Sequence, residues 1–292
     1  MTRRKLDPYL LILPAILFVL LVYFYPVYKI ITDSFFSIDG AQRTPVGLQN
    51  YRFILFDDAT FRTALSNNLR LLLGIPILVI LALALAFFLY TQIKGWQGFR
   101  FIVIIPYILS ITAIAITFDY VLREHGLLNS ILQTIGLGAL ARNWLGDAKI
   151  AIYSILGVVI WKEFGFGVIL FLARMMSVER QTVEAAIIDG ASSLQTFRYI
   201  ILPDMKNVIV FYVVINMINM LSWMFNYIFV MTRGGPVMST YVLEYYIYQT
   251  GIRYRQYGLS AALAVITLVL AILLVIGQSV IRQRLMREEA GA

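Results

Sequence analysis

Several polar side chains stand in apolar stretches long enough to cross a membrane, where a polar group is costly and therefore functional by default. Asn216, Asn219, Trp223 and Asn226 recur at spacings that place them on one continuous helical face. Amides bind sugar hydroxyls both as donors and as acceptors, and an aromatic ring covers the C–H side of a sugar. This stripe indicates a sugar pathway, although buried amides also join neighbouring helices.

A second polar group, Trp161-Lys162-Glu163, interrupts another apolar stretch near its middle. A charged pair at such a depth is expected to face a pathway or a partner subunit. Trp161 and Glu163 are therefore further candidates for contact with cargo. A purely structural pair between Lys162 and Glu163 is equally compatible with the sequence.

The composition assigns these residues to a polytopic membrane protein. Hydrophobic residues make up 60% and charged residues 14% of the 292 residues, whereas soluble domains have about 45–50% and about 25%. The chain has no cysteine and a single histidine, His125, which excludes disulfides, Cys-based metal sites and His-cluster metal sites. The net charge of +8 is explained by Lys and Arg flanking membrane spans, and we expect no nucleic-acid partner.

Six apolar runs are long enough to span a membrane, which predicts an all-α fold with six transmembrane helices. The predicted spans are 9–31, 69–90, 101–122, 150–173, 208–231 and 258–281. Residues 127–135 alternate apolar and polar faces but are too short to span, so they are expected to form an amphipathic surface helix.

The distribution of Lys and Arg orients these spans. Twelve basic residues fall on the side of the two termini and nine on the other side, and the densest clusters lie at the termini. The twelve are residues 3, 4, 5, 94, 100, 174, 180, 198, 206, 282, 284 and 287. Both termini and the charged loop 174–206 are therefore predicted to be cytoplasmic.

The charged loop has the signals of a helix-turn-helix. Ser177 is expected to cap a first helix, and Gly190 to end it in the left-handed conformation. Ser192 and Gln195 match a capping box that starts a second helix, and Pro203 suits the first turn of the fifth span. The pattern alone is equally compatible with a loop that packs on its own membrane domain.

The spacing within this loop resembles the EAA signature of permease subunits of binding-protein-dependent ABC importers. The matching residues are Glu184, Ala185, Ala186, Gly190, Ile200, Leu202 and Pro203. Asp189 and Ala191, which complete the form EAAxxDGA, resemble the carbohydrate-uptake branch, as do Phe197, Trp161 and Gly165-Phe166. Further similarities follow along the chain at Gly47-Leu48-Gln49-Asn50-Tyr51, Gly126-Leu127-Leu128-Asn129, Gly234-Gly235-Pro236 and Tyr257-Gly258.

The resemblance implies a single transmembrane domain over 1–292 that forms half of a sugar pathway in a bacterial plasma (inner) membrane. Its partners would be membrane lipid, a second homologous permease subunit in a heterodimer, a cytoplasmic ATPase dimer and an extracytoplasmic sugar-binding protein. The EAA loop would couple the chain to the ATPase. The chain has no GxxxxGK[ST] motif, so ATP and Mg would be bound by the partner ATPase, with no catalytic residue, cofactor or metal in this chain.

Two other classes compete with this interpretation. An ion-gradient-driven secondary transporter is expected to have intramembrane carboxylates and an internal repeat. The sequence has few intramembrane carboxylates and no clear repeat. A membrane-embedded enzyme would want a cluster of acids, histidines or metal ligands near one face, which a single histidine disfavours.

Overall fold

The computed structural model describes residues 7–39, 42–91 and 95–290. The chain divides into two compact units, residues 1–62 with 246–273 and residues 63–245 with 274–292. The basic residues 3–5 and Lys94, which contribute to the predicted orientation, lie outside the described residues, as do the side chains of Arg282, Arg284 and Arg287.

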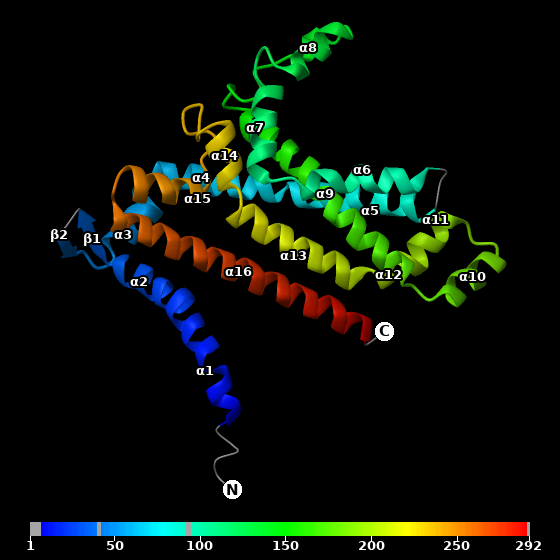
Figure 1. Cartoon of the computed structure of the whole chain (residues 1–292), viewed down its shortest axis with the longest axis horizontal. Helices are drawn as coiled ribbons and strands as arrows, with labels where there is room; N and C mark the ends of the chain where they lie inside the picture. The colour runs from blue at the N-terminus through cyan, green and yellow to red at the C-terminus, as the bar shows by residue number, and fades with distance from the viewer. Residues whose placement is uncertain (1–6, 40–41, 92–94, 291–292) are drawn as a thin grey trace. The chain divides into compact units, whose positions relative to one another are not determined.

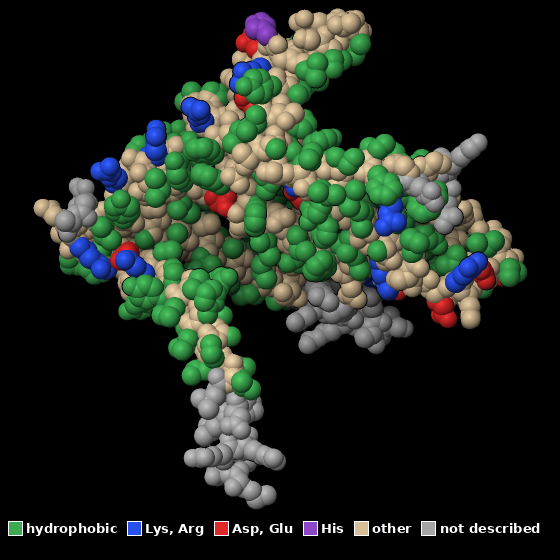
Figure 2. Space-filling model, viewed as in Figure 1, with side chains coloured by type: hydrophobic (Ala, Val, Ile, Leu, Met, Phe, Trp, Pro, Cys, Tyr) green, Lys and Arg blue, Asp and Glu red, His purple; other side chains and the backbone are tan. Residues whose placement is uncertain are grey.

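The first unit combines helical segments with a two-stranded hairpin (Figure 1). Its elements are α1 (Asp7–Val19), the π-helical turn η2 (Leu20–Phe24), α2 (Tyr25–Asp33), β1 (Phe36–Asp39), β2 (Gln42–Pro45), α3 (Gln49–Arg52), η3 (Phe53–Asp57) and η6 (Gln249–Arg253). The strands are antiparallel, with Phe36 opposite Pro45. Hydrophobic side chains cover the described part of the first helix, as a lipid-facing span requires (Figure 2).

Hydrogen bonds between segments distant in sequence stabilise this unit. Asn50 donates its amide to the carbonyl oxygens of Ser34, at 2.8 Å, and Phe36, at 3.1 Å. The carboxylate of Asp58 accepts the backbone N–H groups of Thr60 and Phe61, which caps the helix that follows. A buried polar group is tolerated where such partners satisfy it.

The second unit is entirely helical in its described part. Its elements are α5 (Gly74–Tyr90), α6 (Trp96–Ile108), α7 (Ile111–Val121), α8 (Leu127–Thr134), η4 (Gly138–Leu140), α9 (Ala151–Met176), α10 (Arg180–Ile188), α11 (Ser193–Thr196), η5 (Phe197–Ile201), α12 (Leu202–Asp204), α13 (Lys206–Ser222) and α14 (Phe225–Met231). Three further helices have residues in both units: α4 (Ala59–Leu72), α15 (Leu243–Tyr248) and α16 (Tyr257–Ala290).

Helix α9 forms the centre of the second unit. It packs along α5 and α6 and also contacts α13 (Figure 1). Its buried positions occur all round the helix, including Ile155, Val159 and Phe171, as expected for a helix enclosed by others. This helix also carries Lys162 and Glu163, so the packing that buries α9 also determines where the charged pair lies.

The predicted all-α membrane fold is confirmed. Four helices are long and apolar enough to cross a membrane, and two bent helix pairs raise the number to six if each pair is one span. The second span begins earlier than predicted, at Ala59, and the last helix extends beyond the predicted 281 to Ala290. The helix predicted over 127–135 is present as α8, and its place at a membrane surface stays a prediction.

The third span is not the single straight helix that was predicted for 101–122. It bends by 97° between α6 and α7, where Leu109 and Ser110 adopt extended conformations. Pro106 lies within the last turn of α6, and proline removes a backbone donor and favours such breaks.

The predicted fifth span, 208–231, is also interrupted. The interruption is a break at Trp223–Met224, between α13 and α14. A bend of 67° at Met205, just before the predicted span, separates α12 from α13. Pro203 therefore does not begin the fifth span as predicted. It lies in the short helix α12, two residues before the bend.

Substituting Gly165 with alanine is expected to destabilise the second unit. A Cβ at this position would collide with the backbone carbonyl oxygen of Val103 on α6, which has no flexible end that can yield. Overpacking of this kind costs about 1–3 kcal/mol, so the thermal midpoint of the purified protein should fall. Gly157, on the same helix with open space around its Cβ position, supplies the control: Gly157→Ala should leave the midpoint unchanged or raise it, and equal midpoints for both variants would contradict this packing.

Candidate functional site

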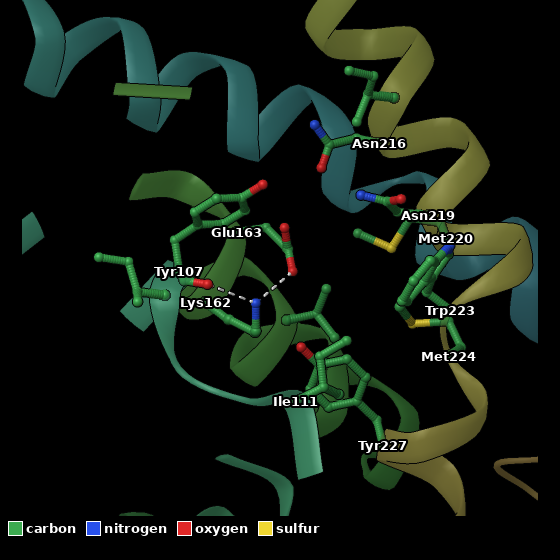
Figure 3. A pocket seen from close by; sticks show the side chains of 13 residues that line it. Tyr107, Ile111, Lys162, Glu163, Asn216, Asn219, Met220, Trp223, Met224 and Tyr227 are labelled. Atoms are coloured by element: carbon green, nitrogen blue, oxygen red, sulfur yellow. Dashed lines mark hydrogen bonds and ion pairs between the residues drawn. The ribbon is translucent and has the colours of Figure 1, made fainter. Parts of the chain in front are cut away.

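A half-enclosed cavity of about 500 Å³ opens within the second unit (Figure 3). This volume falls within the range of small-molecule sites, which is about 300–1,000 Å³. The lining residues are Tyr107, Ile108, Ile111, Val159, Lys162, Glu163, Ile215, Asn216, Asn219, Met220, Trp223, Met224 and Tyr227. Helices α9 and α13 and the bent pair α6–α7 therefore supply most of the wall.

The charged pair of α9 lies in this wall. Lys162 Nζ is 3.3 Å from Glu163 Oε1 and donates to the Tyr107 carbonyl oxygen at 3.2 Å (Figure 3). That carbonyl belongs to the last turn of α6, whose carbonyls have no partner within the helix and attract a cation. Lys162 and Glu163 thus form an ion pair and also line the cavity, and contact with cargo stays a prediction.

Three of the four residues in the predicted stripe of amides and tryptophan line the cavity. Asn219 and Trp223 line it, and the Trp223 side chain is exposed. Asn216 also lines it but is buried, and its amide donates back to the Tyr212 carbonyl at 2.8 Å. Asn226 is not a lining residue, because the break after Ser222 ends the continuous face that was predicted.

Trp161 is not among the lining residues either. Its ring packs against Phe118, with ring centroids 5.0 Å apart. The immediate neighbours of Trp161 on a helix point elsewhere, so adjacency to Lys162 and Glu163 in sequence does not place it beside them in space.

Sequence reasoning did not identify Tyr107 and Tyr227 as lining residues. Tyr227 is buried beside the cavity, and its hydroxyl has no hydrogen-bond partner in the described part of the chain. The available signal for Tyr107 was its position directly after Pro106, because a helix that breaks there presents its last turn to the interior.

The charged loop forms the predicted pair of helices. Helix α10 ends at Ile188, and Gly190 follows with φ of +87°, in the left-handed region that favours glycine. The capping box of the second helix is present, since Gln195 N–H donates to Ser192 Oγ and Ser192 N–H to Gln195 Oε1. The prediction for Ser177 is wrong: α9 extends to Met176, and the Ser177 hydroxyl donates back to the Arg174 carbonyl at 2.8 Å.

The outer face of α10 is exposed and carries both apolar and charged side chains. Ile188 is 85% exposed, and Ala185 and Asp189 are exposed beside it. Glu184 is exposed and pairs with Arg180 at 2.7 Å. Exposed apolar side chains grouped on one loop mark an interaction surface.

The opposite face of the loop is attached to the membrane helices. Phe197 packs on Phe87 of α5 at a centroid distance of 4.6 Å, and Arg174 at the end of α9 pairs with Asp204 at 2.6 Å. Ala191 lines a pocket between the loop and the end of α5, Leu202 is half-buried, and Pro203 is exposed. The loop is therefore in direct contact with both α5 and α9.

Within the described residues, no group of three or more His, Asp and Glu side chains is arranged to hold a metal ion. The described residues thus form a polar cavity among the helices and, separately, a loop with an exposed helix, α10.

Comparisons with known proteins agree with this arrangement. Residues 57–287 match the family described as binding-protein-dependent transport system inner membrane component. The chain is 34% identical over 278 residues to the probable ABC transporter permease protein YurN of Bacillus subtilis (strain 168), covering 93% of this chain and 94% of that protein. It is 31% identical to the trehalose/maltose transport system permease protein MalF of Thermococcus litoralis, covering 90% and 89%.

A solved structure of a bacterial ABC transporter involved in the import of the acidic polysaccharide alginate is similar in fold and sequence. It has a TM-score of 0.81 and 25% identity, covering 97% of this chain and 96% of that chain. The family model extends over most of the chain and the similarity to YurN over nearly all of it. The chain therefore belongs to the binding-protein-dependent transport system inner membrane components, the non-catalytic permease subunits of ABC importers.

Proposed function

We propose that this permease carries uncharged sugars through the cavity formed by α6, α9, α13 and α14. The observation that supports this most directly is the lining, which combines an amide, an exposed indole ring and an unpartnered tyrosine hydroxyl at Asn219, Trp223 and Tyr227. Amides and hydroxyls bind sugar hydroxyls, and the indole covers the apolar face of the ring. Trehalose, maltose and alginate are the sugars that the names of the relatives described above carry.

The charges in the cavity wall favour uncharged sugars over acidic ones as cargo. Lys162 and Glu163 are the charged residues of the cavity wall, and they pair with each other. An acidic sugar would need a cation free of a competing carboxylate, because a buried anion is stable only when it is paired.

The permease would form the transport pathway together with a second permease subunit. Its proposed partners are a homologous second permease, a cytoplasmic ATPase dimer that binds ATP and Mg, and an extracytoplasmic sugar-binding protein. Residues 1–292 would form one transmembrane domain in the bacterial inner membrane, with both termini in the cytoplasm.

The loop is proposed to couple this domain to the ATPase. Helix α10, with Glu184, Ala185 and Ala186, would sit in a groove of the ATPase, where the small alanines permit close approach. Asp189 and Gly190 would form the turn, and Ala191, Leu202 and Pro203 would join the loop to the spans. Closure of the ATPases would move α10 as a rigid body. The following segments of the loop, through Phe197 against α5 and Asp204 against α9, would carry that motion to the cavity.

The test is sugar uptake into proteoliposomes that contain the importer purified with its partner subunits. We expect uptake of uncharged oligosaccharides to require ATP and the binding protein, and acidic alginate oligosaccharides to be excluded. Asn219→Leu and Tyr227→Phe should each lower uptake by about tenfold, the effect of about 1.4 kcal/mol of lost binding.

Asn226 provides the matched control for these substitutions, since it continues the same sequence pattern but does not line the cavity. Asn226→Leu should leave uptake unchanged. Uptake driven by an ion gradient without ATP would refute the proposed function, and equal losses for Asn219→Leu and Asn226→Leu would refute the proposed path.

A further inference from the structure

The break between α13 and α14 leaves backbone groups that a continuous helix would pair. Trp223 has φ of −132°, and its N–H makes the last bond of α13, to the Asn219 carbonyl at 2.9 Å. In an unbroken helix the Met220 carbonyl would accept the Met224 N–H, and Phe225 N–H would bond one residue further on. At the break these groups need other partners, because unpaired buried backbone groups are costly.

Asn68 of α4 supplies the partner for the carbonyl. Its amide nitrogen donates to the Met220 carbonyl at 3.0 Å, and its amide oxygen accepts Leu243 N–H at 2.9 Å. The Asn68 side chain is fully buried, so both bonds are made away from solvent. A single amide thus joins the end of α13 to the beginning of α15.

Glu244, the next residue of α15, supplies the partner for the N–H groups. Its carboxylate accepts Phe225 N–H at 2.8 Å and interacts with Met224 N–H. Burial raises the pKa of Glu244 from its usual value of 4.5 to about 7, and the two N–H groups oppose this shift. The Glu244 carboxyl group is thus partly buried at the start of α14, where backbone N–H groups need a hydrogen-bond acceptor.

We propose that Asn68 and Glu244 are positioning residues for transport. They stabilise the break in the fifth span at Trp223 and so determine how Trp223 faces the cavity. The two side chains replace the helical bonds lost at the break, one on each side of it. The inference rests on the proposed function, in which the cavity carries the cargo. Neither residue lines the cavity, so their effect on cargo is exerted through Met220, Trp223 and Met224.

The first test compares two substitutions of Glu244 in the complete importer. Glu244→Met removes the acceptor, and we expect the KM for sugar uptake to rise by about tenfold while kcat stays within about twofold, the pattern of lost binding. Glu244→Gln keeps an acceptor oxygen and should restore a KM close to that of the wild type. Equal KM values for the Met and Gln variants would overturn the proposal.

A second pair of variants covers the case in which Glu244→Met does not assemble. Asn68→Asp keeps the acceptor for Leu243 N–H but loses the donor to Met220. The control is Asn67→Asp, which introduces the same buried charge but loses donors to Ser239 and Tyr241, away from the break. Only Asn68→Asp should raise the KM, and an equal rise in both would contradict the proposal.

The fluorescence emission of Trp223 in the purified importer reports on the surroundings of the break independently of transport. Replacing Trp96, Trp144 and Trp161 with phenylalanine leaves Trp223 as the only tryptophan of this chain; partner tryptophans are subtracted with a matching Trp223→Phe sample. We expect Glu244→Met to shift the Trp223 emission and Glu244→Gln to leave it in place. An unchanged emission in Glu244→Met refutes the inference. Absence of ATP-dependent sugar uptake by the wild type refutes the proposed function instead, so the two failures are distinguishable.

The pH dependence of stability separates the carboxyl group from its amide replacement. When folding raises the pKa of an acid, that acid stabilises the folded protein most at a pH below the pKa that it has in the unfolded chain. That stability is lost as the pH rises to the pKa that the acid has in the folded protein. For Glu244 the loss runs from about 4.5 to about 7. The Tm of Glu244→Gln relative to wild type should therefore increase between about pH 5 and about pH 8, and a constant difference would contradict the burial of this carboxyl group.

Discussion

We expect ATP-driven uptake to be lost when Glu184 is replaced by alanine and Gly190 by proline in the same chain. Gly190 has φ of +87°, which proline cannot adopt, so the turn after α10 must rearrange. Glu184 is exposed on the surface proposed to enter the ATPase groove. Truncation of residues that anchor an interface typically costs about 2 kcal/mol or more, so we expect uptake to fall by at least about 30-fold in proteoliposomes.

A matched double variant on another part of the chain tests whether this loss is specific. Gly136 follows α8 with φ of +81° and, like Gly190, has open space around its Cβ position. Glu124 is an exposed carboxylate near the same helix. Glu124→Ala with Gly136→Pro should leave uptake near the wild-type rate. Intact uptake in the Glu184 and Gly190 variant would show that the loop does not couple this chain to an ATPase.

Removal of Glu163 alone is expected to destabilise the permease severely, because Lys162 would remain as a buried cation without its carboxylate. Lys162 is 5% exposed and bonds only to Glu163 and the Tyr107 carbonyl among the described hydrogen bonds and ion pairs. Breaking a buried pair costs about 3–5 kcal/mol, whereas replacing both members with apolar residues is often neutral. Glu163→Leu should therefore assemble poorly, and Lys162→Met with Glu163→Leu should regain thermal stability.

The same double variant distinguishes a purely structural pair from one that also contributes to the path of the sugar. If the pair contributes to the path of the sugar, the double variant should be stable but should transport slowly, since two polar groups have left the cavity wall. Thermal midpoint and uptake are measured on the same preparation. Wild-type uptake in the stable double variant would make the pair purely structural.

Local signals in the loop were sufficient to predict its two helices. Gly190, Ser192 and Gln195 act on backbone groups within a few residues of themselves, so their roles can be inferred from spacing alone. Ser177 was misassigned because serine also bonds back to a carbonyl three residues earlier, and the apolar pattern does not show whether α9 continues to Met176. Confirmation of the helices does not test the proposed coupling role.

The cavity was less accessible to sequence reasoning because its shape depends on breaks that distant residues stabilise. The stripe from Asn216 to Asn226 assumes one continuous helix. The structure interrupts that helix at Trp223, with Asn68 and Glu244 supplying the replacement hydrogen bonds. No pattern within the fifth span contains this information, so Asn226 was included, and Tyr227, on the next helix, was missed.

Site-directed cross-linking tests the central claim, that this loop is the contact between the permease and an ATPase. The chain contains no cysteine, so Ala185→Cys on the exposed face of α10 places a unique thiol on the proposed docking surface. In membranes that contain the assembled importer, a thiol-directed photo-cross-linker at this position should capture a partner that binds an ATP analogue, and the cross-link should stop uptake. Leu140→Cys, exposed near α8, should capture no such partner. Absence of an ATP-binding partner at Ala185→Cys, or uptake that continues after cross-linking, would contradict the account.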